Sequence, residues 1–306
     1  MKYKKISVLI VTYKQADVIG RNIESILQQK EYGLHEIVIC DDCSPDNNWD
    51  VIQSYVKMYP NVIRAYRNNP NLGIYGNSDK CASLHGDADL FCWLEGDDAL
   101  CNGFFKAIQE AIIEQKIDVS QAVGIQANFK SIDPQGNVRV YKNDYVSRHL
   151  CSPVSAKIRQ LTSWRGSVFS KKVIEQFKPT VLNKGLALAE ELFDVQWFRY
   201  ADKFYYINVD GSIYYTGIGV SVELNGTEFK KWAIESIYKW EFLIMNLLTN
   251  VRDTNHARSQ IQLSKLRMNR SLRTYFQYVA LYVRGNIGYP IKYRNILALL
   301  KTIRNF

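Results

Sequence analysis

The most constraining feature of this sequence is a regular alternation of apolar and amphipathic segments over roughly its first 115 residues. Short apolar runs rich in β-branched residues predict buried strands at 6–12, 36–40, 62–66 and 90–94. Between and after them, apolar side chains at helical spacing predict helices at 17–29, 49–58, 77–84 and 104–114. Asp17 is the expected cap of the first helix. This alternation is typical of an α/β protein with a Rossmann-like, doubly wound, mostly parallel sheet.

Polar residues follow each predicted strand. Such a sheet binds its ligands outside the carboxyl ends of the strands, so these residues are the first candidates for a site. They are Tyr13 after the first strand, 41–46 after the second, 68–71 after the third and 95–98 after the fourth.

The sharpest chemical signal is the segment Glu95-Gly96-Asp97-Asp98. Three carboxylates in four residues repel one another, and a hard divalent cation such as Mg²⁺ or Mn²⁺ offsets their charge while bridging to a diphosphate. The glycine lets the backbone turn closely beside a ligand. The alternative is an acidic surface turn that caps a following helix, but the position at a strand's carboxyl end favours the ligand site.

A second acidic pair, Asp41-Asp42, ends the neighbouring predicted strand. A carboxylate there can accept a hydrogen bond from a nucleobase imide or a ribose hydroxyl, and Tyr13 can stack on the base. The alternative for the pair is an N-terminal cap of the next helix, although Ser44 and Asp46 are adequate candidates for that task.

The pattern changes after Gly124. Residues 123–130 and 138–142 flank a turn and predict a hairpin, and further strands are expected at 164–170, 203–208 and 212–216, with a helix at 188–200. Three helices are expected at 228–248, 260–283 and 289–304. We therefore expect a domain at 1–225, with halves 1–118 and 119–225, followed by a helical extension at 226–306.

Four segments in this order resemble the family 2 glycosyltransferases, which are inverting enzymes with the GT-A nucleotide-diphosphate-sugar fold. They are SVLIVTYKQADVIGRNIESILQQ at 7–29, EIVICDDCSPDN at 36–47, NPNLGIYGN at 69–77 and FCWLEGDDAL at 91–100. The resemblance covers roughly the first 100 residues closely and extends more loosely to residue 221. It implies transfer of a sugar from a nucleotide-sugar donor, with UDP the usual carrier, to a hydroxyl of a glycan or lipid-linked glycan in surface polysaccharide synthesis.

The resemblance also implies roles for individual residues. The Val11 backbone, Tyr13 and Asp42 would hold the base, and the acidic segment would hold the ribose and the metal–diphosphate. Asp97 and Asp98 are both candidates for the ligand of Mn²⁺ or Mg²⁺, and Glu95 would complete the donor site.

The family places a catalytic carboxylate later in the chain, usually the second of an acidic pair that opens a helix. The matching stretch is LALAEELFDVQWF at 186–198, so Glu191 is the expected general base, with Glu190 beside it in the acceptor site. Such a base takes the proton of the acceptor hydroxyl during attack on the anomeric carbon. The alternative is that both residues only stabilise the first turn of a helix through its dipole.

The sequence departs from the family pattern in two places. The acidic pair is Glu-Glu instead of the common Glu-Asp, and YYTGIGVS at 214–221 lacks the Arg or His that many relatives carry, which leaves an additional diphosphate contact unassigned. Trp164 and Arg165 match the region where relatives bind the acceptor. Trp164 can stack on a sugar ring or be a buried core residue, and both interpretations remain open.

The positive charge of the chain is concentrated in its last quarter. Residues 226–306 carry 14 Lys or Arg and 4 Asp or Glu, a net of +10, whereas the chain as a whole has a formal net charge of +9. This asymmetry indicates an anionic partner, such as a phospholipid surface, a lipid-phosphate acceptor or a nucleic acid. Of these we expect an anionic membrane surface and no nucleic acid. Apolar runs too short to span a bilayer, and cysteines without a disulfide pattern, predict a cytoplasmic protein, at most peripheral on the inner face of the cell membrane.

Two other classes of protein compete with this interpretation. A nucleotidyltransferase that makes the donor would carry a glycine-rich loop with a basic residue after the first strand, and Tyr13-Lys14-Gln15-Ala16 is not such a loop. A non-catalytic module could bind a glycan or another anion through the aromatic and basic segment at 270–284. The apolar residues of that segment fall at helical spacing, which favours a packed or membrane-lying amphipathic helix.

Overall fold

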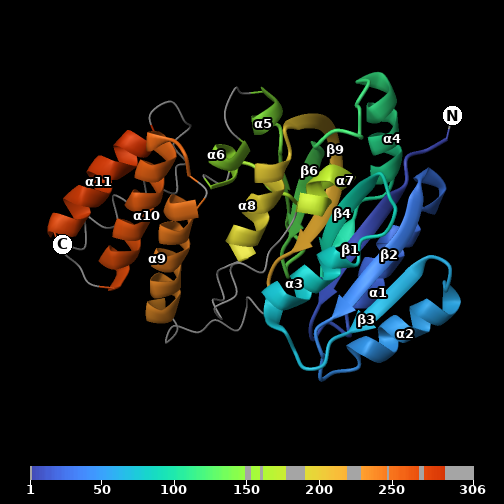
Figure 1. Ribbon diagram of the computed structural model, residues 1–306. Coiled ribbons are helices and arrows are strands. Elements are labelled where there is room, and N and C mark those ends of the chain that lie inside the picture. Colours follow the sequence, from blue (N-terminus) through green and yellow to red (C-terminus); the bar gives the residue numbers. More distant parts are fainter. Residues whose placement is uncertain are drawn as a thin grey trace. The chain divides into compact units, whose positions relative to one another are not determined.

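The computed structural model of the chain describes residues 2–148, 153–158, 161–176, 190–218, 229–246, 248–268 and 272–286. The chain divides into two compact units (Figure 1). The first consists of Met1–Gly185 and Phe193–Glu223, and the second of Leu186–Leu192 and Leu224–Phe306.

The first unit is built on one sheet, to which the described residues contribute nine strands. The strands are β1 (Ile6–Thr12), β2 (Leu34–Asp41), β3 (Ile63–Arg67), β4 (Leu90–Glu95), β5 (Ala99–Leu100), β6 (Val123–Ile132), β7 (Val138–Tyr141), β8 (Ser167–Ser170) and β9 (Lys203–Tyr215). Their order is β3-β2-β1-β4-β8-β6-β9-β5, with β7 paired to β6. The β3-β2-β1-β4 part is parallel, and β8 runs antiparallel to both of its neighbours. This confirms the predicted α/β class and the mostly parallel sheet.

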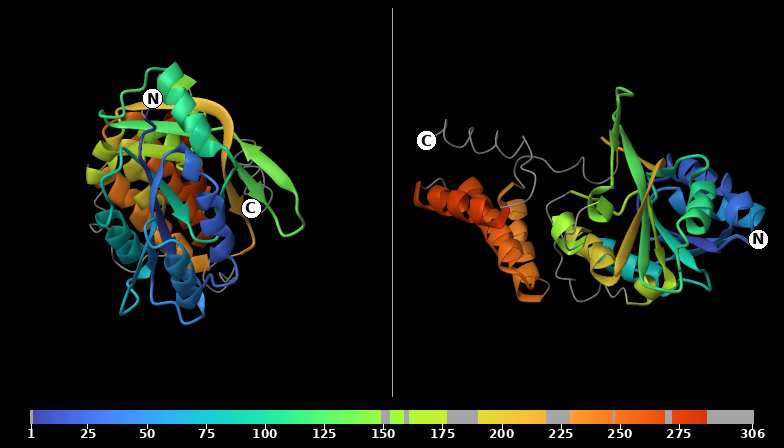
Figure 2. Two further views of the ribbon diagram at one scale, coloured as in Figure 1. Left: turned by 90° about the vertical axis from the view of Figure 1, so that its right-hand side faces the viewer. Right: turned by 90° about the horizontal axis from the view of Figure 1, so that it is seen from above.

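Helices cover both faces of this sheet, as Figures 1 and 2 show. They are α1 (Ile19–Leu27), α2 (Asn48–Met58), α3 (Gly73–Ser83), α4 (Phe104–Glu114), α5 (Tyr145–Arg148), α6 (Pro153–Ile158), α7 (Lys171–Gln176) and α8 (Glu190–Tyr200), with the short 3-10 helix η1 (Lys30–Tyr32) after α1. Ile10 of β1 belongs to one buried cluster with Ile23 of α1 and Phe105 of α4. Trp93 of β4 contacts Trp197 of α8, at 5.9 Å between ring centroids. Burial on both faces explains the uninterrupted apolar strands of the sequence.

Two local expectations in this unit are wrong. Asp17 does not cap α1, because Val18 occupies the N-cap position and no side chain bonds the free amides there. The two strands expected at 203–208 and 212–216 form the single strand β9, which pairs with β6 through register shifts near Asn128. The expected hairpin after residue 122 is confirmed as β6 and β7.

The second unit contains α9 (Phe229–Asn246), α10 (Val251–Met268) and α11 (Leu272–Asn286). Tyr275, Tyr278 and Tyr282 of α11 pack with Leu266 of α10 in a small apolar cluster. The helix expected at 260–283 is wrong as a single element, because this range spans the end of α10 and most of α11. The helix expected at 289–304 lies outside the described residues. Among the described helices, none combines the length and the apolar character that crossing a bilayer requires.

Candidate active site

The ends of three adjacent strands bring the predicted site residues to one edge of the sheet. Val11 of β1 lies opposite Glu95 of β4, and Thr12 of β1 lies opposite Asp41 of β2. The chain leaves the sheet directly after these pairs, and backbone bonds tie the exits together. The Gly96 amide donates to the Val11 carbonyl at 3.0 Å, and the Asp42 amide donates to the Thr12 carbonyl at 3.0 Å. The Val11 carbonyl, which was predicted to contact the base, therefore already accepts a hydrogen bond from the chain itself.

Glu95, Asp97 and Asp98 form a compact acidic cluster, in which one carboxylate oxygen of each lies within 4.8 Å of the others. Asp98 is 1% exposed, and its Oδ1 is buried without a hydrogen-bond partner. Gly96 leaves little room for a side chain, because an added Cβ would lie 2.8 Å from Cβ of Thr12 in β1. An unsatisfied carboxylate oxygen among three converging carboxylates is a donor set that suits a hard divalent cation.

Helix α1 fixes the backbone of this cluster from behind. Nδ2 of Asn22 donates to the carbonyls of Glu95 at 2.8 Å and Asp98 at 3.0 Å. Nη2 of Arg21 donates to the carbonyl of Asp97 at 2.7 Å. Sequence analysis did not single out either residue. A signal existed for Asn22, because it is a polar residue beside the apolar stripe of an amphipathic helix, and a buried amide needs partners.

The surroundings raise the pKa values of Asp97 and Asp98. Burial, reinforced by the charge of Glu95, raises the pKa of Asp97 from 3.8 to about 6. Burial also raises the pKa of Asp98 well above its usual value; the Arg165 guanidinium opposes this rise, whereas Glu95 and Asp97 add to it. A bound cation would relieve this repulsion, so the electrostatics of the cluster agree with its donor set.

Arg165 contacts the acidic cluster directly. Its Nη2 lies 2.5 Å from Oε2 of Glu95, and its Nε lies 3.3 Å from Oδ2 of Asp98. The sequence predicted Arg165 to lie in the acceptor site and did not predict these ion pairs. Trp164 is 2% exposed, which favours the core interpretation of this side chain over stacking on a sugar.

Asp42 and Tyr13 lie at the same edge of the sheet as the cluster. Asp42 is 3% exposed, and its Oδ1 accepts hydrogen bonds from Nδ2 of Asn68 and the amide of Leu72, both at 2.8 Å. The Tyr13 ring is half-buried, with the ammonium of Lys14 5.3 Å from its centroid. Asn68 was part of the expected polar loop, but its bond to Asp42 was not foreseen.

Helix α8 begins at Glu190, so the acidic pair occupies the first two positions of a helix, as expected. The side chains of Glu190 and Glu191 lie outside the described residues. Their assignment to the acceptor site and to the general base therefore stays a prediction.

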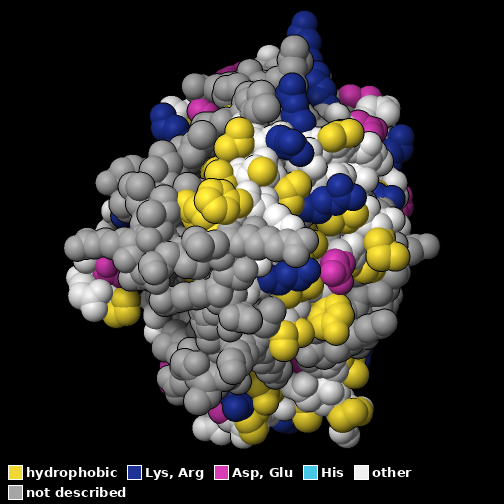
Figure 3. All heavy atoms as spheres, turned by 90° about the vertical axis from the view of Figure 1, so that its left-hand side faces the viewer, with side chains coloured by type: hydrophobic (Ala, Val, Ile, Leu, Met, Phe, Trp, Pro, Cys, Tyr) yellow, Lys and Arg dark blue, Asp and Glu magenta, His cyan; other side chains and the backbone are white. Residues whose placement is uncertain are grey.

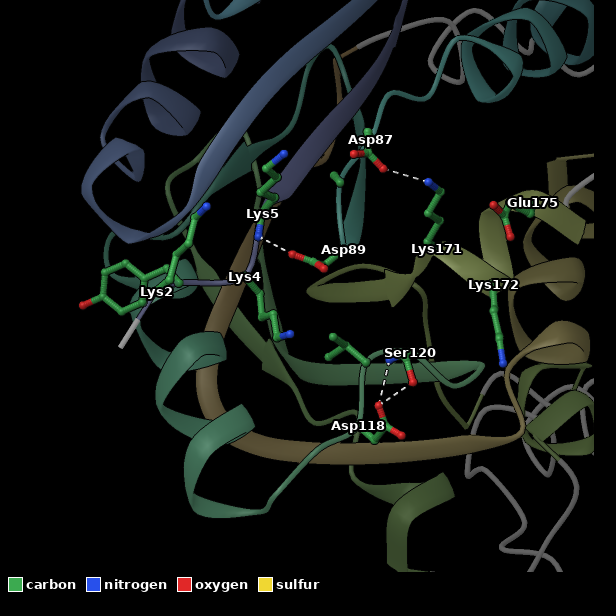
Figure 4. Close-up of a pocket in the computed structure, with 13 residues that line it drawn as sticks. Lys2, Lys4, Lys5, Asp87, Asp89, Asp118, Ser120, Lys171, Lys172 and Glu175 are labelled. Carbon is green, nitrogen blue, oxygen red and sulfur yellow. Dashed lines mark hydrogen bonds and ion pairs between the residues drawn. The ribbon is translucent and has the colours of Figure 1, made fainter.

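A pocket of about 500 Å³ opens at the opposite, amino end of the strands (Figure 4). Two of its carboxylates are paired, one with a lysine and one with a backbone amide. Nζ of Lys171 lies 2.9 Å from Oδ1 of Asp87, and the Lys5 amide donates to Oδ2 of Asp89 at 2.8 Å. This pocket contains none of the predicted site residues, and ligands of such sheets bind at the other edge.

Comparison with known proteins identifies the class. The profile of glycosyl transferase family 2 matches residues 7–176. Together with the GT-A sheet and its acidic segment after β4, this match shows that the chain belongs to glycosyl transferase family 2.

Several relatives are similar over part of the chain or over the fold. WfaP of Escherichia coli, a UDP-Glc:α-D-GlcNAc-diphosphoundecaprenol β-1,3-glucosyltransferase, is 34% identical over 93 residues, which are 30% of this chain and 35% of WfaP. The matches cover between 26% and 38% of the curated relatives' own length. Among solved structures, Staphylococcus aureus TarS in complex with UDP-GlcNAc has a TM-score of 0.60 at 13% identity, covering 96% of this chain and 83% of TarS 1–349. The Pyrobaculum calidifontis mannosyltransferase PcManGT, in complex with GDP-Man and Mn²⁺, has a TM-score of 0.56 at 10% identity, covering 100% of this chain and 82% of the other.

Proposed function

We propose that this protein is an inverting, metal-dependent glycosyltransferase that moves a sugar from a nucleotide-diphosphate sugar to a glycan or lipid-linked glycan hydroxyl. The observation that carries the proposal is the acidic cluster of Glu95, Asp97 and Asp98 at the carboxyl end of β4. Such an edge is where α/β sheets bind their ligands, and a fixed group of carboxylates there can hold the cation that a diphosphate needs.

Asp97 is the better candidate for the direct metal ligand. Asp98 is 1% exposed, and its Oδ2 is occupied by the Arg165 guanidinium, whereas Asp97 is only partly buried. A metal that also contacts a diphosphate must lie on the open side of the cluster. When bound, Mn²⁺ or Mg²⁺ would supply positive charge to the departing diphosphate.

The nucleoside would lie beside the cluster, between the ends of β1 and β2. Tyr13 offers a ring for stacking on the base, and Asp42 offers a carboxylate that Asn68 already orients. UDP is the proposed carrier, since TarS, with a similar fold, is described in complex with UDP-GlcNAc and WfaP is named for a UDP-Glc donor.

Glu191 is the proposed general base, with Glu190 beside it in the acceptor site. A carboxylate there would remove the proton of the acceptor hydroxyl as its oxygen attacks the anomeric carbon, and a single in-line displacement inverts that carbon. The expected consequence of Glu191→Gln is a fall in turnover of about 10²- to 10⁴-fold with little change in donor affinity. Donor binding is the control, because a misfolded variant would lose both.

The proposal is tested by incubating the protein with UDP-, GDP- and dTDP-sugars, with Mn²⁺ or with EDTA, and detecting released nucleoside diphosphate. Turnover of one donor that EDTA and Asp97→Asn both abolish would support it. Because turnover without acceptor can be slow, donor binding is measured in parallel by calorimetry. Absence of both turnover and metal-dependent binding for every donor would refute the proposal.

The acceptor is proposed to be lipid-linked, and the second unit to meet the membrane that carries it. Four large apolar side chains of α9 and α11 are exposed by more than half: Tyr238 at 56%, Met245 at 83%, Phe276 at 66% and Val283 at 57%. Figure 3 shows hydrophobic side chains together with Lys and Arg on the coloured part of one face. Flotation with vesicles of anionic phospholipid should retain the protein at low salt and release it at high salt, and neutral vesicles are the control.

A further inference from the structure

The loop before β8 holds Arg165 in a defined position. Asn143, which is 1% exposed, donates from Nδ2 to the Arg165 carbonyl at 2.7 Å and accepts the Ser163 amide at Oδ1 at 2.9 Å. The next residue, Gly166, has a φ of +67° and accepts the Ala127 amide at 2.7 Å. Nε2 of Gln126 in β6 also donates to the Ser163 carbonyl at 3.1 Å, so the loop is bonded to β6 on both sides of Arg165.

Aromatic rings and carboxylates then fix the guanidinium itself. Its Cζ lies 4.4 Å from the ring centroid of Tyr214 and 4.8 Å from that of Trp164. Tyr214 reaches the cluster because Ile213 of β9 pairs with Ala99 of β5, directly after Asp98. The Arg165 side chain remains 18% exposed, so it lies at the border of the acidic cluster and not beneath it.

The charge of the acidic cluster indicates a role for Arg165. Three ionised carboxylates around a divalent cation leave a net charge of −1, which repels a diphosphate. The Arg165 guanidinium, in contact with two of those carboxylates, offsets that negative charge. A planar guanidinium is also well shaped for phosphate oxygens.

We propose that Arg165 is a donor-site residue that contacts the phosphate from which the sugar departs. In the reaction, the bond between the anomeric carbon and the phosphate oxygen breaks and its electron pair stays on that oxygen. Arg165 offsets the negative charge that develops there, while the acceptor proton passes to the general base. This inference rests on the proposed function.

The test compares nucleotide affinities by calorimetry at saturating Mn²⁺. UDP, GDP and dTDP are titrated into the unmodified protein, and the tightest ligand and its monophosphate are then titrated into the variants. Arg165→Gln should weaken diphosphate binding by about 10- to 100-fold, as expected for one charge-assisted hydrogen bond, and monophosphate binding by less than about 3-fold. Arg165→Lys, which keeps the charge but loses the planar fork, should fall between the two proteins.

Lys130→Gln is the matched control. It removes a cation of the same sheet that pairs with Asp210 at 2.8 Å, and it should leave both affinities unchanged. The Mn²⁺ affinity of each variant is measured as well. A loss of Mn²⁺ affinity that accounts for the whole loss of diphosphate binding in both Arg165 variants would show that Arg165 only organises the carboxylates and would overturn the inference. Unchanged diphosphate binding would overturn it too. If no diphosphate binds the unmodified protein, the proposed function fails first, and this inference falls with it.

Discussion

Electrostatic repulsion within the acidic cluster destabilises the folded protein, and Asp97→Asn should remove part of it. The pKa of Asp97 is raised from 3.8 to about 6, first by burial and then by the charge of Glu95. A carboxyl group with a raised pKa in the folded protein opposes folding once it is ionised. Asp97→Asn should therefore stabilise the metal-free protein at pH 7.5, although it removes a residue of the proposed active site.

The magnitude follows from the shift of the Asp97 pKa. A rise of about two units corresponds to about 3 kcal/mol of unfolding free energy, since each unit is worth about 1.4 kcal/mol. Below pH 3.8, the pKa of Asp97 in the unfolded chain, this carboxyl group is protonated in both the folded and the unfolded state and does not change the unfolding free energy. As the pH rises toward 6, the unfolded state ionises first and stability is lost. The advantage of the variant should thus approach 3 kcal/mol above pH 7 and shrink below about 1 kcal/mol near pH 4.

The assay is urea unfolding in EDTA at pH 4 and pH 7.5, repeated with Mn²⁺. Mn²⁺ should stabilise the unmodified protein at pH 7.5, because a ligand that binds only the folded state shifts the equilibrium toward it. Asp97→Asn should lose most of this gain. Asp118→Asn is a control of opposite sign, because hydrogen bonds from Ser120 lower the pKa of that exposed group. If Asp97→Asn is less stable than the unmodified protein at pH 7.5 in EDTA, the repulsion argument is wrong.

Three further substitutions probe the scaffold of the site. Asn22→Ala removes the donor to two cluster carbonyls and should cost about 2 to 3 kcal/mol in urea unfolding, with weaker Mn²⁺ binding by calorimetry. Gly96→Ala places a Cβ 2.8 Å from Cβ of Thr12 and should weaken Mn²⁺ binding at least about tenfold, so unchanged affinity would contradict the close approach. Gly166→Ala introduces a Cβ 2.6 Å from the Asn128 carbonyl at a φ of +67° and should lower the unfolding free energy by about 1 to 3 kcal/mol.

The first half of the fold could be predicted because its apolar runs and helical periodicity match the burial that its strands and helices have in the sheet. Strands β1 and β4 are buried on both faces and read as apolar runs, and α4 has the bounds expected from its periodicity. The later elements could not be bounded as well. Strand β9 continues past Asp210 and Gly211, which interrupt its apolar pattern, because its pairing with β6 and β5 outweighs that interruption.

The candidate site was only partly accessible to sequence reasoning. The acidic segment and the exits of β1 and β2 could be found, since consecutive polar residues mark the ends of buried strands. The contacts of Arg165 with Glu95 and of Asn22 with two backbone carbonyls could not, because they join residues about 70 positions apart that no local pattern connects. Only the folded chain brings these pairs together.

The ion pairs of Arg165 join residues that lie about 70 positions apart in the chain. The carboxylates of Glu95 and Asp98 come from the first half of the chain, and their counter-charge comes from the second. A chimera that joins this first half to a second half without a cation at position 165 would inherit unbalanced carboxylates. Among homologues, the charge at 165 should therefore covary with the acidity at 95 and 98.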